Sequence, residues 1–316
     1  MKQKIFFRAD ASGQIGYGHF IRTLALADML KDDFECKFFT SEPTEYQIGE
    51  LQKVCSYVSL SEDTKFEDFI DCLDGTEIVV LDNYFYTTEY QREIKAKGCK
   101  LVCIDDIHDK HYVADMVINH ALTDKSLFDV EPYTRLCLGY EYALLRSPFL
   151  KPVKNEHRNN DIIVNFGGAD PYGVTDRIVS MLVELDTPYN IIVILGEKVR
   201  LSKENREKVT IRQNLSAEKM AMLFEQSAAG ILSASTVCIE ALSRNLPLMV
   251  GYHVDNQTEI YRVLKDSKRV MPLGFLQETS IDTLSESLEN VSKAKVYRFP
   301  SNIKERITNK FKELSC

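Results

Sequence analysis

Strand-like and helix-like stretches alternate along most of the chain. In the first half, short runs that are apolar on both faces occur at "KIFFRAD", "CKFFT", "EIVVLDN", "CKLVCIDD", "DMVINH" and "RLCLGY". Helical patterns separate several of these runs, as at 18–31 and 87–97. Runs of this kind are typical of parallel strands that are covered by helices on both faces. The pattern therefore predicts an α/β domain with a doubly wound, Rossmann-like sheet.

The alternation pauses at residues 146–161 and then resumes. The pause, "RSPFLKPVKNEHRNND", carries two prolines, many polar residues and little that could form a core, which predicts a linker. Strand-like runs resume at "DIIVNFGGAD", "YNIIVILG", "KVTIRQN", "AAGILSAS", "LPLMVGY" and "KRVMPLG". Helical patterns separate these runs over 172–186, 216–226, 236–244, 255–266 and 280–293.

Two α/β domains are the simplest interpretation of this order. We expect two doubly wound domains that face each other across a cleft, because open α/β sheets bind ligands at the carboxyl ends of their strands. The last segment is amphipathic, with Ile303, Ile307 and Phe311 four residues apart, and is expected to pack back onto the body. The predicted boundaries are 1–148 for the N-terminal domain, 149–160 for the linker, 161–298 for the C-terminal domain and 299–316 for the final helix.

Composition and charge exclude several classes of function. The chain has 316 residues, of which 44% are apolar and 27% charged, as expected for a globular protein of about two domains. Its net charge of −8 argues against a nucleic-acid partner. It has no run of about 18 apolar residues and no secretory signal, so we expect a cytoplasmic protein without a membrane span. The eight cysteines are scattered, and several lie inside strand-like runs, which is typical of small buried hydrophobes.

A glycine-rich stretch, "RADASGQIGYGH" at 8–19, joins the first strand-like run to the first helical pattern. Gly13, Gly16 and Gly18 would let the backbone approach a ligand, and the N-terminus of the following helix offers N–H groups to an anion such as a pyrophosphate. The spacing is G-x-x-G-x-G and differs from the dinucleotide fingerprint G-x-G-x-x-G. A tight turn without a ligand is the alternative.

His19 follows these glycines in the first turn of the helix. The positive end of a helix disfavours imidazolium, so a histidine here tends to stay neutral and able to act as a general base. A histidine that merely caps or packs is the alternative. Arg22, one turn further on, would pair with a diphosphate or with a carboxylate. Asp10, at the end of the first strand, would orient His19, bind a sugar or cap the turn.

Two similar turns follow strands in the second half. One contains Gly167 and Gly168, with Pro171 suited to the first turn of a helix. The other, at 233–236, contains Ser235 and Thr236 and forms a second candidate anion site. The carboxylate of Glu240, one turn into the next helix, can accept hydrogen bonds from two ribose hydroxyls. The segment "GYHVDNQ" adds polar residues at the same sheet edge, which are His253, Asn256 and Gln257. Anion-binding turns in both domains fit a nucleotide sugar.

Several motifs match a known family together and in order, from residue 4 to about 257. They are "RADASGQIGYGH" with Arg22, "LDNY" at 81–84, "IDD" at 104–106, "LGYEYALLRSPF" at 138–149, "FGGAD" at 166–170, "SASTVCIEAL" at 233–242 and "DNQ" at 255–257. With these motifs the chain resembles the nucleotide-sugar hydrolases of pseudaminic acid biosynthesis. That family is similar in fold to the murein glycosyltransferase, which has the two-domain GT-B architecture.

The resemblance implies that water cleaves UDP-2,4-diacetamido-2,4,6-trideoxy-β-L-altropyranose into UDP and the free amino sugar. It implies inversion at the anomeric carbon, with no metal and no cofactor. His19 would activate the water, Tyr84 and Asn256 would line the sugar site, and Glu240 would bind the ribose. Family members often have a histidine where this chain has Asn83. The candidate substrate-binding residues are Asp10, Gly16, Gly18, Arg22, Tyr84, Asn256 and Gln257, and the candidate UDP-binding residues are Gly167, Gly168, Ser235, Thr236 and Glu240.

Other chemistries are weaker interpretations of the same residues. The sequence has no D-x-D motif to hold a metal–diphosphate. Cys99 and Cys103 resemble half of a zinc site but lie on one predicted strand, and strand residues four apart are about 13 Å distant. Asp105 and Asp106 end that strand as a ligand-edge or turn-forming pair. Two alternatives stay open: a GT-B glycosyltransferase that uses a UDP-amino sugar, and a dinucleotide-dependent oxidoreductase with Glu42 on a ribose.

Overall fold

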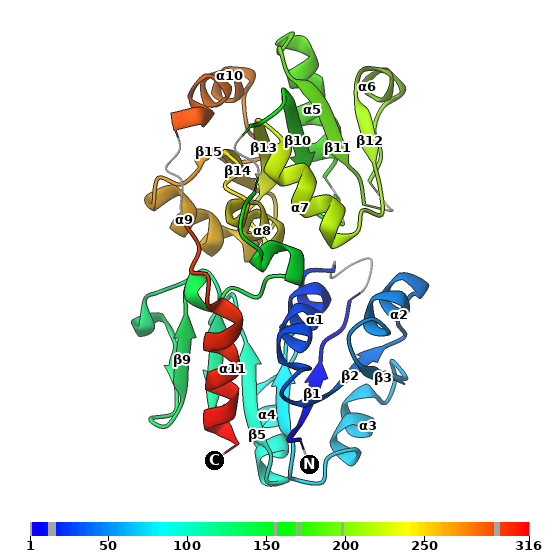
Figure 1. The fold of residues 1–316 in the computed structure, drawn as a ribbon, viewed down its shortest axis with the longest axis vertical. Coiled ribbons are helices and arrows are strands. Elements are labelled where there is room, and N and C mark those ends of the chain that lie inside the picture. The colour runs from blue at the N-terminus through cyan, green and yellow to red at the C-terminus, as the bar shows by residue number, and fades with distance from the viewer. Residues whose placement is uncertain are drawn as a thin grey trace. The chain divides into compact units, whose positions relative to one another are not determined.

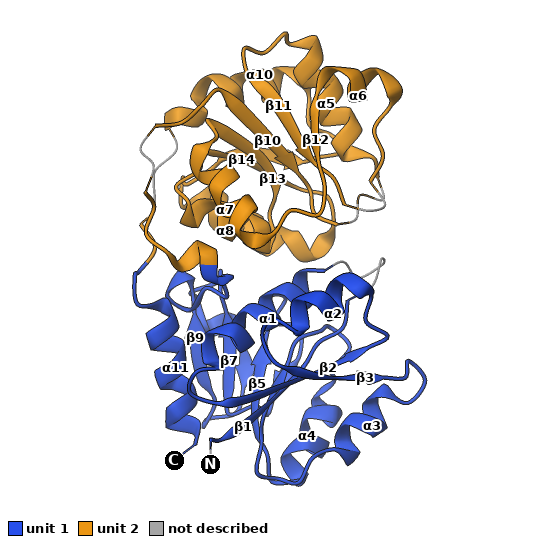
Figure 2. Cartoon of the chain, turned by 45° about the vertical axis from the view of Figure 1, so that its right-hand side comes forward, with its two compact units in different colours: residues 1–147, 300–316 blue, residues 148–299 orange. Residues whose placement is uncertain are grey.

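The computed structural model describes residues 2–11, 17–154, 157–168, 170, 172–196, 199–293 and 298–315. The chain divides into two compact units (Figure 2). Unit 1 comprises Met1–Ser147 and Pro300–Cys316, and unit 2 comprises Pro148–Phe299.

Unit 1 is built on a seven-stranded sheet in the order β3-β2-β1-β4-β5-β7-β9, in which every pair of neighbours is parallel. The chain builds outward from β1 in one direction and then, through β4, in the other, so the topological switch point lies between β1 and β4. The strands are β1 (Lys4–Arg8), β2 (Glu35–Ser41), β3 (Ser56–Leu60), β4 (Ile78–Leu81), β5 (Lys100–Ile104), β7 (Met116–Asn119) and β9 (Arg135–Leu138). The helices are α1 (Gly18–Leu30), α2 (Glu45–Leu51), α3 (Lys65–Asp71), α4 (Thr88–Ala96) and α11 (Ile303–Leu314), with the short pair β6 (His111–Tyr112) and β8 (Asp129–Val130) beside the sheet.

The centre of unit 1 is aromatic. Phe7 on β1 stacks on Phe38 of β2 with ring centres 6.2 Å apart, and Phe20 of α1 meets Phe38 edge-on at 5.4 Å. All three side chains are fully buried, which fixes α1 against the β1–β2 side of the sheet. The glycine-rich stretch therefore delivers the first turn of α1 to the carboxyl end of β1.

Unit 2 has a six-stranded parallel sheet in the order β12-β11-β10-β13-β14-β15, with its switch point between β10 and β13. The strands are β10 (Asp161–Asn165), β11 (Asn190–Ile194), β12 (Thr210–Arg212), β13 (Ala229–Ser233), β14 (Leu248–Tyr252) and β15 (Met271–Phe275). The helices are α5 (Val174–Glu184), α6 (Lys203–Lys208), α7 (Ala217–Gln226), α8 (Thr236–Ser243), α9 (Thr258–Asp266) and α10 (Ile281–Asn290), with a short 3₁₀ turn at Asp255–Gln257. The predicted fold class, two doubly wound α/β units, is confirmed.

The segment predicted as a linker is fastened to unit 2. Phe149 is buried and packs against Phe224 with ring centres 6.2 Å apart. The expectation that this segment offers little to a core is therefore wrong at Phe149. Arg158 fixes the other end, because its guanidinium donates to five backbone carbonyls, those of Phe224, Glu225, Ser227, Arg244 and Asn245.

The last helix, α11, lies in unit 1, although it follows unit 2 in the chain (Figure 1). Its Phe311 is fully buried against Phe34, with ring centres 6.3 Å apart. Ion pairs add to this contact, among them Lys304 with Asp32 at 2.8 Å and Lys312 with Asp33 at 2.6 Å. Unit 2 is thus inserted into the sequence of unit 1.

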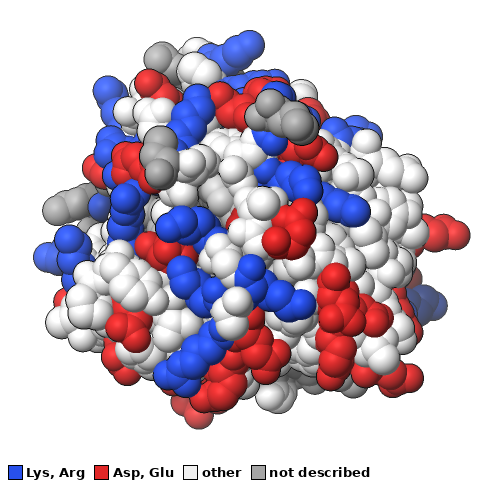
Figure 3. Space-filling view, turned by 90° about the horizontal axis from the view of Figure 1, so that it is seen from below, with Lys and Arg blue, Asp and Glu red and all other residues white. Residues whose placement is uncertain are grey.

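On the face drawn in Figure 3, basic and acidic side chains are interspersed. No helix within the described ranges has the length and apolar character needed to cross a membrane.

Candidate active site

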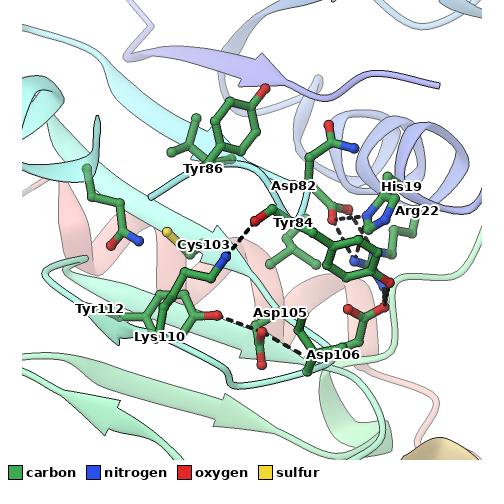
Figure 4. A pocket seen from close by; sticks show the side chains of 15 residues that line it. His19, Arg22, Asp82, Tyr84, Tyr86, Cys103, Asp105, Asp106, Lys110 and Tyr112 are labelled. Atoms are coloured by element: carbon green, nitrogen blue, oxygen red, sulfur yellow. Dashed lines mark hydrogen bonds and ion pairs between the residues drawn. The ribbon is translucent and has the colours of Figure 1, made fainter. Parts of the chain in front are cut away.

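A pocket in unit 1 lies at the carboxyl ends of β4 and β5, next to the first turn of α1 (Figure 4). This is the switch-point edge of the sheet, where open α/β sheets bind ligands. About 310 Å³ of space, open solvent included, lies between the lining side chains. His19, Arg22, Asp82, Tyr84 and Asp106 line one side of it.

Asp82, directly after β4, is the centre of a buried network. Its carboxylate meets Nδ1 of His19 at 2.7 Å and accepts hydrogen bonds from Nε and Nη2 of Arg22 at 2.7 and 2.6 Å. The Thr23 hydroxyl donates a further bond at 2.8 Å. Burial raises the pKa of Asp82, but the charge of Arg22 and the contact with His19 outweigh it and lower the pKa to about 2. Asp82 is therefore ionised at neutral pH.

Nε2 is the nitrogen of His19 that is left for a ligand, because Nδ1 lies 2.7 Å from Asp82 and 3.0 Å from Nη2 of Arg22. A neutral imidazole that carries its proton on Nδ1 donates to Asp82 and keeps the lone pair on Nε2. The ring of Tyr84 stands edge-on to His19, with ring centres 4.5 Å apart, and restricts its rotation. His19 is only 4% exposed. The arrangement is that of an oriented base, with Asp82 as the orienting group.

Arg22 joins two buried carboxylates. Besides Asp82 it binds Asp106, at 2.7 Å from Nη1 to Oδ2, and the Tyr84 hydroxyl donates to the same oxygen at 3.1 Å. The sequence left a diphosphate or a surface carboxylate as partners of Arg22. The structure shows two carboxylates, and both are buried. The guanidinium thereby offsets one of the two negative charges on the side of the pocket where His19 lies.

Asp10 does not orient His19. Both its oxygens are bound by Arg8, one at 2.8 Å, and the backbone N–H of Ser41 donates to it at 2.7 Å. Burial raises the pKa of Asp10, but hydrogen bonding and the charge of Arg8 bring it below the usual value. Asn83 accepts from the backbone N–H of Asp10 at 2.7 Å. Asp10 thus links the ends of β1, β2 and β4. Asp82, and not Asp10, is the carboxylate in contact with His19.

The residues considered for zinc serve other purposes. Cys103 lies on β5, as predicted, whereas Cys99 directly precedes the strand. Asp105 forms a turn, because its carboxylate accepts from the backbone N–H of His108 at 2.9 Å and from the Tyr112 hydroxyl at 2.6 Å. No group of three or more histidine, cysteine or acidic side chains suited to a metal occurs in the part of the chain that the structure describes.

His120, directly after β7, is a buried histidine whose two ring nitrogens have no hydrogen-bond partner. Burial and the charge of Arg22 lower its pKa to about 4, while Asp106 and Asp82 oppose the shift. Between pH 6.5 and 4, His120 binds a proton in the unfolded chain but stays neutral in the folded chain. The free energy of unfolding should therefore fall by about 3 kcal/mol between pH 6.5 and 4 on account of this residue.

The variant His120→Leu tests this expectation. The free energy of unfolding of unit 1 is measured by urea unfolding, followed by pulsed hydrogen exchange of its peptides. In the variant it should lose most of its pH dependence. His111→Leu is the control, because the hydrogen bonds that His111 donates to Asp129 and Glu131 raise its pKa and give its contribution the opposite sign. If the free energy of unfolding of His120→Leu still fell between pH 6.5 and 4 as it does in the unchanged protein, His120 would not be the cause of this pH dependence.

The glycines proposed for ligand approach differ in what surrounds them. Gly18 is the first residue of α1, and a Cβ there would meet no atom within 4 Å. Gly167 has a φ of +94° and similarly open space, whereas Gly168 is approached closely by Gly196. Gly16 and Gly13 lie outside the described residues.

The candidate UDP residues of unit 2 follow β10 and β13, and the candidate substrate residues Asn256 and Gln257 follow β14. Ser235 occupies the N-cap position of α8 and Thr236 begins the helix, without a side-chain capping bond. Glu240 is buried on α8, and Gln257 accepts from the backbone N–H of His253 at 3.0 Å. Asn256 lies beside Gln257 in the 3₁₀ turn. These residues therefore occupy the carboxyl edge of the sheet, the position expected for ligand contacts.

The turn after β10 differs from the prediction. Helix α5 begins at Val174, two residues later than the helical pattern predicted, and Pro171 lies outside the described residues. Asp170 is the reason, since its carboxylate accepts the N–H groups of Val174 and Thr175 at 2.9 and 2.7 Å. The N-terminus of α5 is thus capped by the protein itself, whereas that of α8 is not.

Asp82 is the functional candidate that sequence reasoning missed. It lies inside the quoted "LDNY" segment, but 63 positions from His19 in sequence. Its signal is an acidic residue directly after a fully apolar strand. This signal becomes specific once β4 is known to lie next to β1.

Comparisons with known proteins find similar sequences and similar folds. No protein-family model matches it. An uncharacterized protein of Methanocaldococcus jannaschii is 28% identical over 292 residues, and the match covers 82% of this chain and 57% of that relative. The UDP-2,4-diacetamido-2,4,6-trideoxy-β-L-altropyranose hydrolase of Campylobacter jejuni is 27% identical over 271 residues, covering 80% of this chain and 93% of the relative.

Solved structures resemble the whole chain in fold. The MurG structure of Acinetobacter baumannii superposes with a TM-score of 0.66 at 13% identity, covering 98% of this chain and 99% of that one. A UGT protein of Arabidopsis thaliana in complex with UDP gives a TM-score of 0.67 at 9% identity, covering 100% of both chains. By sequence the chain is therefore a homologue of proteins named UDP-2,4-diacetamido-2,4,6-trideoxy-β-L-altropyranose hydrolase, and by structure it has the GT-B glycosyltransferase fold.

Proposed function

We propose that the protein hydrolyses a UDP-linked 2,4-diacetamido-2,4,6-trideoxy sugar and releases UDP and the free sugar. The observation that carries the proposal is the His19–Asp82 pair at the switch-point edge of unit 1. The similarity to the Campylobacter jejuni hydrolase supports the choice of substrate.

In the proposed reaction a water molecule attacks the anomeric carbon, and Nε2 of His19 takes its proton. The bond from the anomeric carbon to the diphosphate oxygen breaks, its electron pair leaves with UDP, and the carbon is inverted. Asp82 stabilises the imidazolium that forms, because it is ionised and fully buried. Tyr84, Gly18, Asn256 and Gln257 would contact the sugar.

UDP is proposed to bind unit 2. The uncapped N-terminus of α8, at Ser235 and Thr236, would offer N–H groups to the phosphates, and Gly167 and Gly168 would allow close approach. Glu240 would accept the ribose hydroxyls. Developing charge on the leaving group would then be met by backbone dipoles rather than by a metal.

A glycosyltransferase is the second candidate, because solved structures of glycosyltransferases share the fold. The two candidates differ in the acceptor. A transferase leaves the sugar nucleotide largely intact until an acceptor alcohol or amine is added, whereas a hydrolase needs only water.

The test is incubation with a panel of UDP-amino sugars in buffer alone, followed by NMR. We expect UDP and the free sugar in equal amounts, with the first-formed anomer opposite to that of the substrate. The rate should be unchanged in EDTA. Sugar transfer that needs an added acceptor would favour the transferase. Loss of activity on chelation, restored by a divalent ion, would contradict the assignment of the diphosphate site.

A further inference from the structure

The pocket of unit 1 extends beyond His19 to helix α4. Gln91 of α4, Cys103 of β5 and Tyr112 of β6 line it together with Leu81, and we call this part the α4 end of the pocket. Gln91 is completely buried. A glutamine at the wall of a pocket and out of contact with solvent needs partners for both ends of its amide.

One end of the Gln91 amide has a partner and the other has none. Its Oε1 accepts the backbone N–H of Val113 at 3.1 Å, which fixes the orientation of the amide, because Nε2 in that place would oppose one donor to another. Nε2 is then a donor without an acceptor among the described residues. A buried donor of this kind costs about 1–3 kcal/mol when it stays unpaired.

The neighbouring polar groups on the pocket wall already have partners. The Tyr112 hydroxyl donates to Asp105 at 2.6 Å, and the Lys110 ammonium donates to the Tyr84 carbonyl at 2.8 Å (Figure 4). The Tyr86 hydroxyl is the other unpaired group among the described lining residues. In Figure 4 it points away from Lys110 and Tyr112. Gln91 Nε2 is thus the donor left for a ligand at the α4 end.

The surroundings restrict what that ligand group can be. An anion is disfavoured, since the three carboxylates that line the pocket, those of Asp82, Asp105 and Asp106, outnumber its two cations, Arg22 and Lys110. A protonated amine is disfavoured, since it would meet the N–H groups of Gln91 rather than an acceptor. A neutral carbonyl oxygen that carries a small apolar group fits both the donor and the apolar side chains of Leu81 and Cys103.

We propose that the α4 end of the pocket is the subsite for one N-acyl group of the sugar, with Gln91 Nε2 donating to the acyl oxygen. The inference rests on the proposed function for its substrate class. It makes Gln91 a specificity-determining residue, which distinguishes an acylated sugar from one with a free amine.

Gln91→Glu is the test variant, because it keeps an acceptor for Val113 and exchanges the donor for an oxygen. Three substrates are compared: the UDP-linked 2,4-diacetamido sugar and its two analogues in which one acetamido group is a free amine. We expect Gln91→Glu to raise KM for the diacetamido substrate about tenfold, with kcat nearly unchanged. For one of the two analogues, the one that lacks the recognised acyl group, the substitution should change KM less than twofold.

Gln47 provides the matched control. It is also a fully buried glutamine of unit 1 whose Nε2 has no partner, but it is not among the residues that line the pocket. Gln47→Glu should reproduce any general loss of stability without a change in substrate preference. If Gln91→Glu fails to fold, Gln91→Met removes the donor at similar length.

A second measurement does not depend on turnover. The side-chain NH₂ signals of Gln91, assigned by their loss in Gln91→Glu, are followed by NMR during titration with the free diacetamido sugar. We expect these signals to shift with the diacetamido sugar. They should not shift with the corresponding sugar in which both acetamido groups are free amines. If UDP is released, but Gln91→Glu changes KM equally for all three substrates and the signals do not shift, the subsite is overturned and the proposed function stands. A shift without UDP release supports the subsite and overturns the hydrolase, and absence of both overturns both.

Discussion

Exchange of His19 for asparagine is expected to slow UDP release by a factor of about 10² to 10⁴. The asparagine amide can still donate to Asp82, as Nδ1 of His19 does, but it offers no basic nitrogen in the place of Nε2. The water would then attack without loss of its proton to a base. The rate is measured with the diacetamido substrate at saturation, and UDP affinity is measured by calorimetry.

UDP affinity should barely change in this variant, because the residues proposed for UDP lie in unit 2. His157→Asn serves as the control, since His157 is an exposed histidine of unit 2. If His19→Asn were folded and kept most of its turnover, His19 would be structural. The base would then have to be sought at Asp105 or Asp106, which line the same pocket.

Replacement of Arg22 by methionine should destabilise unit 1 by about 3–5 kcal/mol. The side chain is 3% exposed and lies between Asp82 and Asp106, so its removal leaves two buried carboxylates without their cation. A loss of this size is a large fraction of the stability of an ordinary domain. Urea unfolding at neutral pH, with hydrogen exchange of unit 1 peptides as the readout, measures it.

Arg92→Met is the comparison for this prediction. Arg92 pairs with Glu89 at 3.5 Å on the surface, and an exposed pair of this kind contributes less than about 1 kcal/mol. Arg22→Lys should fall between the two, because it restores the charge but not the planar fork that reaches both carboxylates. A loss below about 1 kcal/mol for Arg22→Met would show that Asp82 and Asp106 do not depend on Arg22 for their charge.

Most of the fold could be predicted because the strands are apolar on both faces and end in recognisable turns. Strand β3 was missed because Ser56–Leu60 lies at the sheet edge, where most of its side chains keep contact with solvent. Helices α2 and α3 were missed because each has seven residues and buries only two, which leaves too short an apolar pattern to detect.

The candidate site was predicted less completely. Local motifs indicated His19 and Tyr84, whose roles remain predictions. Asp82 and Gln91 depend on which elements become neighbours, and that information is not local: β4 pairs with β1 across the switch point, and α4 follows the loop behind it. A polar residue on a helix gives no sign in the sequence that its amide lines a pocket.

The insertion of unit 2 between β9 and α11 has a consequence for the order of synthesis on the ribosome. Domains generally fold as they emerge, at about 5–20 residues per second, so the roughly 150 residues of unit 2 separate the sheet of unit 1 from α11 by on the order of 10–30 s. During that interval the surface that α11 covers, around Phe34, is bare. Synthesis of unit 1, which holds His19, therefore starts before that of unit 2 and ends after it. While unit 2 is being made, the apolar surface that α11 will cover is accessible to chaperones or to other nascent chains.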